Sequence, residues 1–291
     1  MEVDAVVLDV DGVLVDVEDS YRRAIVESID RVHGETIDRD QVQMFKNAGG
    51  FNNDWELTYA AALYLLAHGR GLKIGLQSFT DEIALNEGGL TAAEAVVEEA
   101  LSEADMEAVR EEWQQTALKD VFQQLYLGET LYRKLEDGEP DMETAGFIYD
   151  EEPLITTEAL GDILERFEVG ILTGRPAAEA DIAINRVGLE DLDGEHVFTR
   201  DDWEGSKPEP DALLELADRL DAESLVFVGD SLDDVRTAVN ANQGDDDRQY
   251  FAIGVLSGGL SGEEGRIEFE LEGADEVVED VNELTAIIDE R

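Results

Sequence analysis

The chain has 291 residues, 43% of them hydrophobic, which is enough for a buried core in one large domain or in a domain with an insertion. Lys and Arg total 21 against 72 Asp and Glu, so the formal net charge is −51 at pH 7. A surface this acidic repels nucleic acids and anionic membranes, so we expect neither as a partner. The absence of cysteine excludes disulfides and thiolate metal sites.

The first predicted element is a buried strand, AVVL at 5–8, which leads directly into Asp9 and Asp11. Residues two apart on extended backbone face the same side, so we expect both carboxylates to project into one space. Gly12 then allows backbone to approach a ligand closely. A calcium loop starting at Asp9 is excluded, because its fifth, sixth and twelfth places hold valine, leucine and serine. Asp-x-Asp recurs elsewhere in this acidic chain, so it is the position after a buried strand that distinguishes this pair.

Residues 17–150 show almost no strand pattern and several long amphipathic patterns, which predict helices over 20–34, 53–69, 90–105 and 106–135. Thr91 and Glu94 have capping-box spacing, and Asn53 with Glu56 is a related start signal. We therefore expect an all-helical insertion between the first strand and the rest of the chain.

Strand and helix patterns alternate from residue 151 onward. Apolar runs predict strands at 169–172, 225–228 and 250–255, and amphipathic patterns predict helices at 153–167, 177–189, 210–220 and 230–242. The acidic segments 243–249 and 261–273 are interpreted as solvated loops. This alternation predicts an α/β fold with a mainly parallel sheet, whose site lies beyond the carboxyl ends of the strands.

Polar residues follow these strands at the positions where such a site is expected. Thr173 and Gly174 follow the second strand, Lys207 precedes a helix that starts after proline, and Asp230 and Asp234 follow the third strand. Carboxylates, a lysine, a hydroxyl and backbone donors together suit a dianionic phosphate with Mg²⁺.

The segments DVDGVLVD, LTGR, SKPEPD and VGDSLDD, in this order, resemble the four motifs of the haloacid dehalogenase (HAD) superfamily. The insertion after the first motif resembles the helical cap of the phosphoglycolate-phosphatase-like branch, in subfamily I. The resemblance implies a Rossmann-like three-layer α/β catalytic core, residues 1–16 and 151–291, with a helical cap domain at 17–150.

The same resemblance implies catalytic and metal-binding roles. Asp9 is implied as the nucleophile that forms an aspartyl-phosphate, and Asp11 as the acid and base that protonates the leaving group and activates water. Thr173 and Lys207 are implied to hold the phosphoryl oxygens. Mg²⁺ is the implied cofactor. It is implied to be held by the carboxylates of Asp9 and Asp230 and the backbone carbonyl of Asp11, with Asp234 assisting directly or through water.

Substrate-binding residues are expected in both parts of the chain: Gly12, Gly174, Arg175, Lys46 and Asn52. For Lys46 and Asn52, a substrate-binding loop and ordinary packing are both open interpretations. Arg175 either lines the site or is an exposed arginine at a strand end. Asn53 and Trp55 are interpreted as a helix cap and as packing.

The implied function is a Mg²⁺-dependent phosphatase acting on a small phosphomonoester, such as phosphoglycolate, a sugar phosphate or an amino-alcohol phosphate like histidinol phosphate. A dehalogenase or a phosphonatase is not expected to keep Asp11. The alternatives are a phosphomutase of the same superfamily and a non-catalytic protein that binds a phosphorylated metabolite. The second alternative is disfavoured, because both Asp9 and Asp11 are present.

Acidic bias, only five lysines and the absence of cysteine resemble cytoplasmic proteins of salt-loving archaea. No apolar stretch approaches the roughly 20 residues that span a bilayer. We therefore expect a cytoplasmic, halophilic protein that is a monomer or a homodimer, with a small phosphorylated metabolite as its partner.

Overall fold

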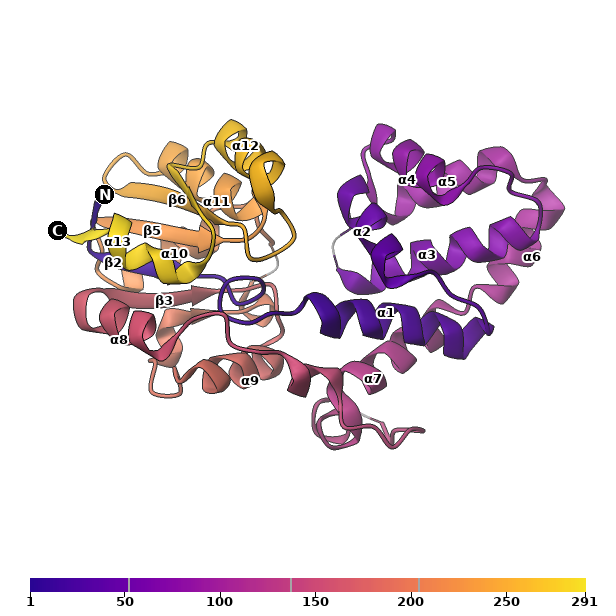
Figure 1. Ribbon diagram of the computed structural model, residues 1–291, viewed down its shortest axis with the longest axis horizontal. Helices are drawn as coiled ribbons and strands as arrows, with labels where there is room; N and C mark the ends of the chain where they lie inside the picture. Colours follow the sequence, from indigo (N-terminus) through magenta and orange to yellow (C-terminus); the bar gives the residue numbers. More distant parts are fainter. Residues whose placement is uncertain (52, 137, 204) are drawn as a thin grey trace. The chain divides into compact units, whose positions relative to one another are not determined.

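The computed structural model describes every residue except 52, 137 and 204 (Figure 1). Its chain divides into two compact units. The α/β unit comprises Met1–Glu18 and Glu151–Arg291, and the helical unit comprises Asp19–Asp150.

The α/β unit contains a sheet of parallel strands with the spatial order β4-β3-β2-β5-β6-β7 in the described part of the chain. The strands are β2 (Ala5–Leu8), β3 (Glu168–Leu172), β4 (Val197–Phe198), β5 (Ser224–Gly229), β6 (Gln249–Val255) and β7 (Glu276–Val278). Strand order reverses at β2 and β5, which are hydrogen-bonded neighbours. In open parallel sheets this switch point is where ligands bind, beyond the carboxyl ends of the strands.

Both faces of the sheet are buried, because alternate residues of each central strand enter two separate hydrophobic clusters. Val6, Val226 and Ile253 pack with α8 (Thr157–Arg166), α9 (Ala177–Val187) and α13 (Leu284–Ile287). Val7, Phe227 and Ala252 pack with α10 (Asp211–Arg219), α11 (Leu232–Gly244) and α12 (Gly262–Glu272). Continuous apolar runs suit strands buried in this way. The predicted α/β fold with a mainly parallel sheet is confirmed.

The chain ends belong to the same unit. The short strands β1 (Glu2–Val3) and β8 (Asp289–Glu290) pair in parallel, and the N-terminal ammonium donates to the carbonyl oxygen of Ile287 at 2.8 Å. The prediction of a loop at 261–273 was wrong, because α12 occupies most of that segment. This helix is held by one fully buried side chain, Phe269, which packs against Gly254 of β6.

The helical unit contains α1 (Glu18–His33), α2 (Arg39–Ala48), α3 (Asp54–Gly69), α4 (Leu76–Leu85), α5 (Gly89–Ala100), α6 (Glu103–Glu112), α7 (Gln115–Leu135) and the 3₁₀ turn Phe147–Asp150. Its described residues form no strand, as the sequence predicts. The single helix predicted over 106–135 is instead divided between α6 and α7, and α7 is kinked at Gly128. Nowhere in the described chain is a helix long and apolar enough to cross a membrane.

Two glycine pairs of the helical unit cross with their backbones in contact. The Gly89 amide donates to the Gly49 carbonyl oxygen at 2.8 Å, and a Cβ at Gly50 would lie 2.6 Å from the Gly88 carbonyl carbon. Gly50 and Gly88 also have positive φ angles, of 74° and 77°. A side chain at either position is therefore strained by conformation and excluded by space.

Candidate active site

Asp9 lies at the centre of the sheet edge, immediately after β2. Its amide donates to the carbonyl oxygen of Val228 in β5 at 3.0 Å, which extends the pairing of the two strands by one residue. Its carboxylate accepts a hydrogen bond from the amide of Val10 at 2.7 Å, and the residue is only 5% exposed. Two neighbouring strands thus fix the backbone that presents this carboxylate.

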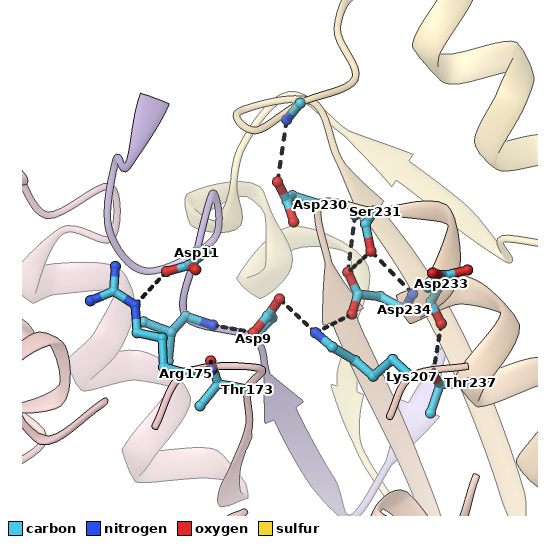
Figure 2. Close-up of polar contacts among 12 residues, drawn as sticks. Asp9, Asp11, Thr173, Arg175, Lys207, Asp230, Ser231, Asp233, Asp234 and Thr237 are labelled. Atoms are coloured by element: carbon cyan, nitrogen blue, oxygen red, sulfur yellow. Dashed lines mark hydrogen bonds and ion pairs between the residues drawn. The ribbon is translucent and has the colours of Figure 1, made fainter. Parts of the chain in front are cut away.

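Lys207 joins Asp9 to a second buried carboxylate, that of Asp234 (Figure 2). The Lys207 Nζ lies 2.8 Å from Asp9 Oδ2 and 2.6 Å from Asp234 Oδ1. Burial by itself would lower the pKa of Lys207, but attraction to Asp234 and Asp9 outweighs it and raises the pKa. The lysine is therefore a fixed positive charge beside Asp9.

Asp230 and Asp234 are placed by the junction between β5 and α11. Ser231 caps α11: Asp234 Oδ2 accepts from the Ser231 amide at 3.0 Å and from its hydroxyl at 2.6 Å. This capping box turns the Asp234 side chain back toward the strand end. Asp230 Oδ2 accepts from the amide of Gly259 at 3.2 Å.

Asp9, Asp230 and Asp234 converge, each offering a carboxylate oxygen within 4.8 Å of the other two. Burial raises the pKa of Asp9; Lys207 partly offsets this, and Asp234 and Asp11 add to it. Burial also raises the pKa of Asp230, as does repulsion from Asp234 and Asp9. A hard divalent cation prefers carboxylate oxygens and would relieve this repulsion, so the donor set fits Mg²⁺.

The two glycines that face Asp230 keep this space open. Gly12 has a φ of 69°, and a Cβ there would overlap the Asp230 carboxylate. A Cβ at Gly258 would overlap the same carboxylate. The Ser257 hydroxyl donates to the Gly12 carbonyl oxygen at 2.7 Å, which ties the two loops together.

Asp11 lies near Asp9, but its carboxylate has a different partner. Figure 2 shows Asp11 directed toward Arg175, whose Nε donates to Asp11 Oδ1 at 2.5 Å, while Asp9 is directed toward Lys207. The Asp11 side chain is 31% exposed. Its carboxylate is not among the three that converge, which are those of Asp9, Asp230 and Asp234.

Thr173 and Gly174 follow β3 at the same sheet edge. The Thr173 amide donates to the Phe198 carbonyl oxygen at 2.9 Å, and its hydroxyl accepts from the Arg175 amide at 3.2 Å. Thr173 is 2% exposed, whereas Gly174 is exposed with open space at its Cα. The ends of β2, β3 and β5 thus carry the acidic cluster and a hydroxyl, and the loop before α10 adds Lys207.

The family model for haloacid dehalogenase-like hydrolases matches residues 3–242. The chain belongs to the haloacid dehalogenase-like hydrolases. Two solved structures share the fold: phosphatase Tt82 from Thermococcus thioreducens (24% identity, TM-score 0.64, 97% of each chain covered) and a predicted phosphoglycolate phosphatase from Haemophilus somnus (14% identity, TM-score 0.57, 98% of this chain and 97% of that chain).

The chain also matches part of a longer curated relative. Imidazoleglycerol-phosphate dehydratase from Phytophthora nicotianae is 27% identical over 238 residues, which is 80% of this chain. The hydrolase chain spans 40% of the length of that relative.

The remaining predicted substrate-binding residues of the hydrolase lie in the helical unit. Lys46, near the end of α2, lines a pocket of 240 Å³ together with Phe51, Asn53 and Asp54. Asn53 caps α3 by accepting from the Glu56 amide at 3.0 Å, which confirms its interpretation as a helix cap. Asn52 lies outside the described residues.

Two side chains of the hydrolase core were missed by the sequence analysis. Glu151 is buried and accepts from Arg175 Nη2 at 3.0 Å, and Ser231 forms the capping box with Asp234. The Ser-x-x-Asp spacing of 231–234 resembles a helix-start signal and could have identified Ser231. Glu151 had no such signal, because one acidic residue does not stand out in this sequence. Arg175 itself is buried, at 2% exposure, so its interpretation as an exposed arginine was wrong.

Proposed function

We propose that this hydrolase is a Mg²⁺-dependent phosphatase that hydrolyses a small phosphomonoester through an aspartyl-phosphate on Asp9. The observation that carries the proposal is the convergence of Asp9 with Lys207 and with the carboxylates of Asp230 and Asp234. A carboxylate attacks a phosphate dianion only if the repulsion between them is cancelled. A lysine and a site for a divalent cation beside that carboxylate supply the positive charge.

In the first step, an Asp9 carboxylate oxygen attacks phosphorus and the bond from phosphorus to the substrate's ester oxygen breaks. Asp11 gives its proton to that oxygen, which leaves as an alcohol. In the second step, Asp11 takes a proton from a water molecule whose oxygen attacks phosphorus, and the bond to Asp9 breaks. Phosphate leaves, and both aspartates return to their starting forms.

Residues of the chain hold the reacting groups throughout. Lys207 keeps Asp9 in place and faces the developing charge, and Thr173 supplies a hydroxyl from the end of β3. When bound, Mg²⁺ would be held by Asp9, Asp230, Asp234 and the Asp11 backbone carbonyl, and it would neutralise the negative charge of the phosphoryl group. The buried setting strengthens these charge interactions.

Substrates are proposed by class. Phosphoglycolate is supported by the name of the Haemophilus somnus structure, and sugar phosphates are a second class left open by the sequence. An imidazole-bearing amino-alcohol phosphate, histidinol phosphate, is supported by the relative whose name carries an imidazole phosphate substrate. Selection among these substrates is proposed to come from residues of the helical unit.

The test is phosphate release from a panel of these esters in molar KCl, with Mg²⁺ and with EDTA. We expect Mg²⁺-dependent release that falls by at least about 10³-fold in Asp9→Asn. The matched control is Asp233→Asn, because Asp233 is half-exposed and pairs with Arg236 instead of the cluster. Equal release by wild type and Asp9→Asn would contradict the proposal, and a phosphoryl group moved within the substrate would indicate a phosphomutase.

A further inference from the structure

Arg175 is a buried cation held between two carboxylates. Its side chain is 1% exposed; Nε contacts Asp11 Oδ1 at 2.5 Å and Nη2 contacts Glu151 Oε2 at 3.0 Å. A guanidinium is planar and rigid, so a bond on one edge determines where the other edge can donate. The position of Arg175, and with it the donor offered to Asp11, therefore depends on Glu151.

Glu151 is itself firmly placed. Its side chain is 0% exposed, and Arg186 Nη1 donates to its carbonyl oxygen at 2.8 Å and lies 3.9 Å from Oε2. The next residue is bound to the end of the first motif: the Asp16 amide donates to the Glu152 carbonyl oxygen at 2.9 Å. The backbone carbonyls of Glu151 and of the next residue are thus bound within the α/β unit.

The linked side chains of Asp11, Arg175 and Glu151 differ sharply in exposure. The Asp11 side chain is 31% exposed, whereas the Arg175 and Glu151 side chains are almost fully enclosed. An exposed carboxylate samples several rotamers unless a partner fixes it. The two buried members have no open path to a substrate, so they act on chemistry through Asp11.

We propose that Glu151 is a positioning residue, which holds the Asp11 carboxylate in place for proton transfer through Arg175. The inference rests on the proposed function, because it assigns no reaction of its own. The proton transfers are those given above: from Asp11 to the leaving oxygen in the first step, and from water to Asp11 in the second. Displacing a catalytic group by about 1 Å costs up to about 10²-fold in rate.

The two steps depend differently on Asp11 when the leaving group is changed. An alkoxide needs a proton in order to leave, whereas 4-nitrophenolate leaves readily without one. With 4-nitrophenyl phosphate, a displaced Asp11 therefore slows the second step and spares the first. With an alkyl phosphate, it slows both steps.

The experiment compares wild type with Glu151→Gln, which keeps the shape of the side chain and removes its charge. The matched control is Glu152→Gln, one residue along the same segment, where the side chain is exposed. Asp11→Asn and the double variant Asp11→Asn with Glu151→Gln complete a cycle that separates action through Asp11 from independent effects. Thermal unfolding of every variant verifies folding, and Arg175→Lys replaces Glu151→Gln if that variant does not fold.

We expect Glu151→Gln to release one equivalent of 4-nitrophenolate in a fast burst, followed by turnover slowed by about 10-fold to 100-fold. Its kcat for alkyl phosphates falls by a similar factor with KM nearly unchanged, and Glu152→Gln behaves as wild type. In the Asp11→Asn background, Glu151→Gln has no further effect.

Three results would overturn the inference. Burst and turnover slowed equally in Glu151→Gln would indicate a general structural role, and effects that add to those of Asp11→Asn would show that Glu151 acts independently. Burst and turnover rates in Glu151→Gln equal to those of wild type would show that Glu151 has no role. If wild type itself releases no phosphate, the proposed function fails first and the inference falls with it.

Discussion

At the scale of single residues, the three converging carboxylates destabilise the folded protein when no divalent cation is bound and stabilise it when one is bound. Burial and mutual repulsion raise the pKa of Asp230 above its ordinary value, so ionising it in the folded protein is unfavourable. Binding Mg²⁺ would convert this repulsion into attraction. The folded state then gains the binding free energy of the ion, by about 2.7 kcal/mol at an ion concentration of 100 times Kd.

The effect of Asp230→Asn on thermal stability is predicted to change sign when Mg²⁺ is added. In EDTA the variant should unfold at a higher temperature than wild type, because one repelling carboxylate is gone. In saturating Mg²⁺ the order should invert, because a ligand is lost. Thermal unfolding in both buffers checks this, with Asp233→Asn as the control. A wild-type midpoint that Mg²⁺ does not raise would be inconsistent with a metal site at this cluster.

Glu179 makes the free energy of unfolding depend on pH. Burial raises its pKa from 4.5 to about 7; Arg175 opposes the shift, and Asp11 adds to it. The folded protein therefore holds a proton that the unfolded chain releases above pH 4.5. Consequently the free energy of unfolding decreases as pH rises toward about 7, by about 3 kcal/mol in total for this group.

Glu179→Gln is predicted to remove that decrease. Relative to wild type, the variant should gain stability steadily from about pH 5 to about pH 7 and level off above it. Urea unfolding across this range measures the difference. The control is Glu158→Gln, an exposed glutamate that also lies in the first turn of a helix. A difference that does not change with pH would show that Glu179 ionises freely in the folded protein.

At the scale of elements, the glycine crossing in the helical unit is a backbone contact that tolerates no side chain. Gly50→Ala is predicted to combine the cost of a left-handed conformation, about 1–2 kcal/mol, with a collision against the Gly88 carbonyl carbon. Gly34 is the matched control, because its φ is also positive and its Cβ would meet nothing within 4 Å. Urea unfolding should show a larger loss for Gly50→Ala by about 1–3 kcal/mol. Equal losses would mean that the crossing adds nothing.

The four central strands β3, β2, β5 and β6 were predictable because their apolar runs are buried on both faces, and β2 spans the predicted residues 5–8 without change. The short strands β4 and β7 at the sheet's edges were not predicted. Helix α12 was not predictable, because it is held by Phe269 while Ile267 and Leu271 on the same helix are 46% and 82% exposed. Its apolar pattern is therefore weak. The predicted capping box at Thr91 was wrong, because α5 begins at Gly89, beside the glycine crossing.

The candidate site likewise contains residues that could be located from the sequence and residues that could not. Residues that directly follow buried strands, such as Asp9 and Thr173, could be located because a strand end fixes where they lie. Glu151 could not, since its bond to Arg175 spans 24 residues and depends on how the chain returns to the sheet. In a chain with 72 acidic residues, spacing alone does not distinguish one buried glutamate.

At the scale of the whole molecule, the net charge of −51 dominates. Repulsion among surface carboxylates destabilises the folded chain, and salt screens it as the Debye length falls from about 10 Å at 0.1 M to about 3 Å at 1 M. We predict that the unfolding midpoint rises steeply between about 0.1 M and about 1 M KCl. Sucrose at matched osmolality is the control, because it does not screen charge. A midpoint that is flat in KCl would contradict this account of the surface.

In the proposed mechanism, Asp9 carries the phosphoryl group between the two steps. The direct measurement is acid quench of the protein during turnover of 4-nitrophenyl phosphate with Mg²⁺, followed by peptide mass spectrometry. The Asp11→Asn variant is used beside wild type, because it should accumulate the intermediate. One phosphoryl group is expected on the peptide that contains Asp9, and none in Asp9→Asn. A phosphoryl group on another residue, or none while phosphate is released, would contradict it.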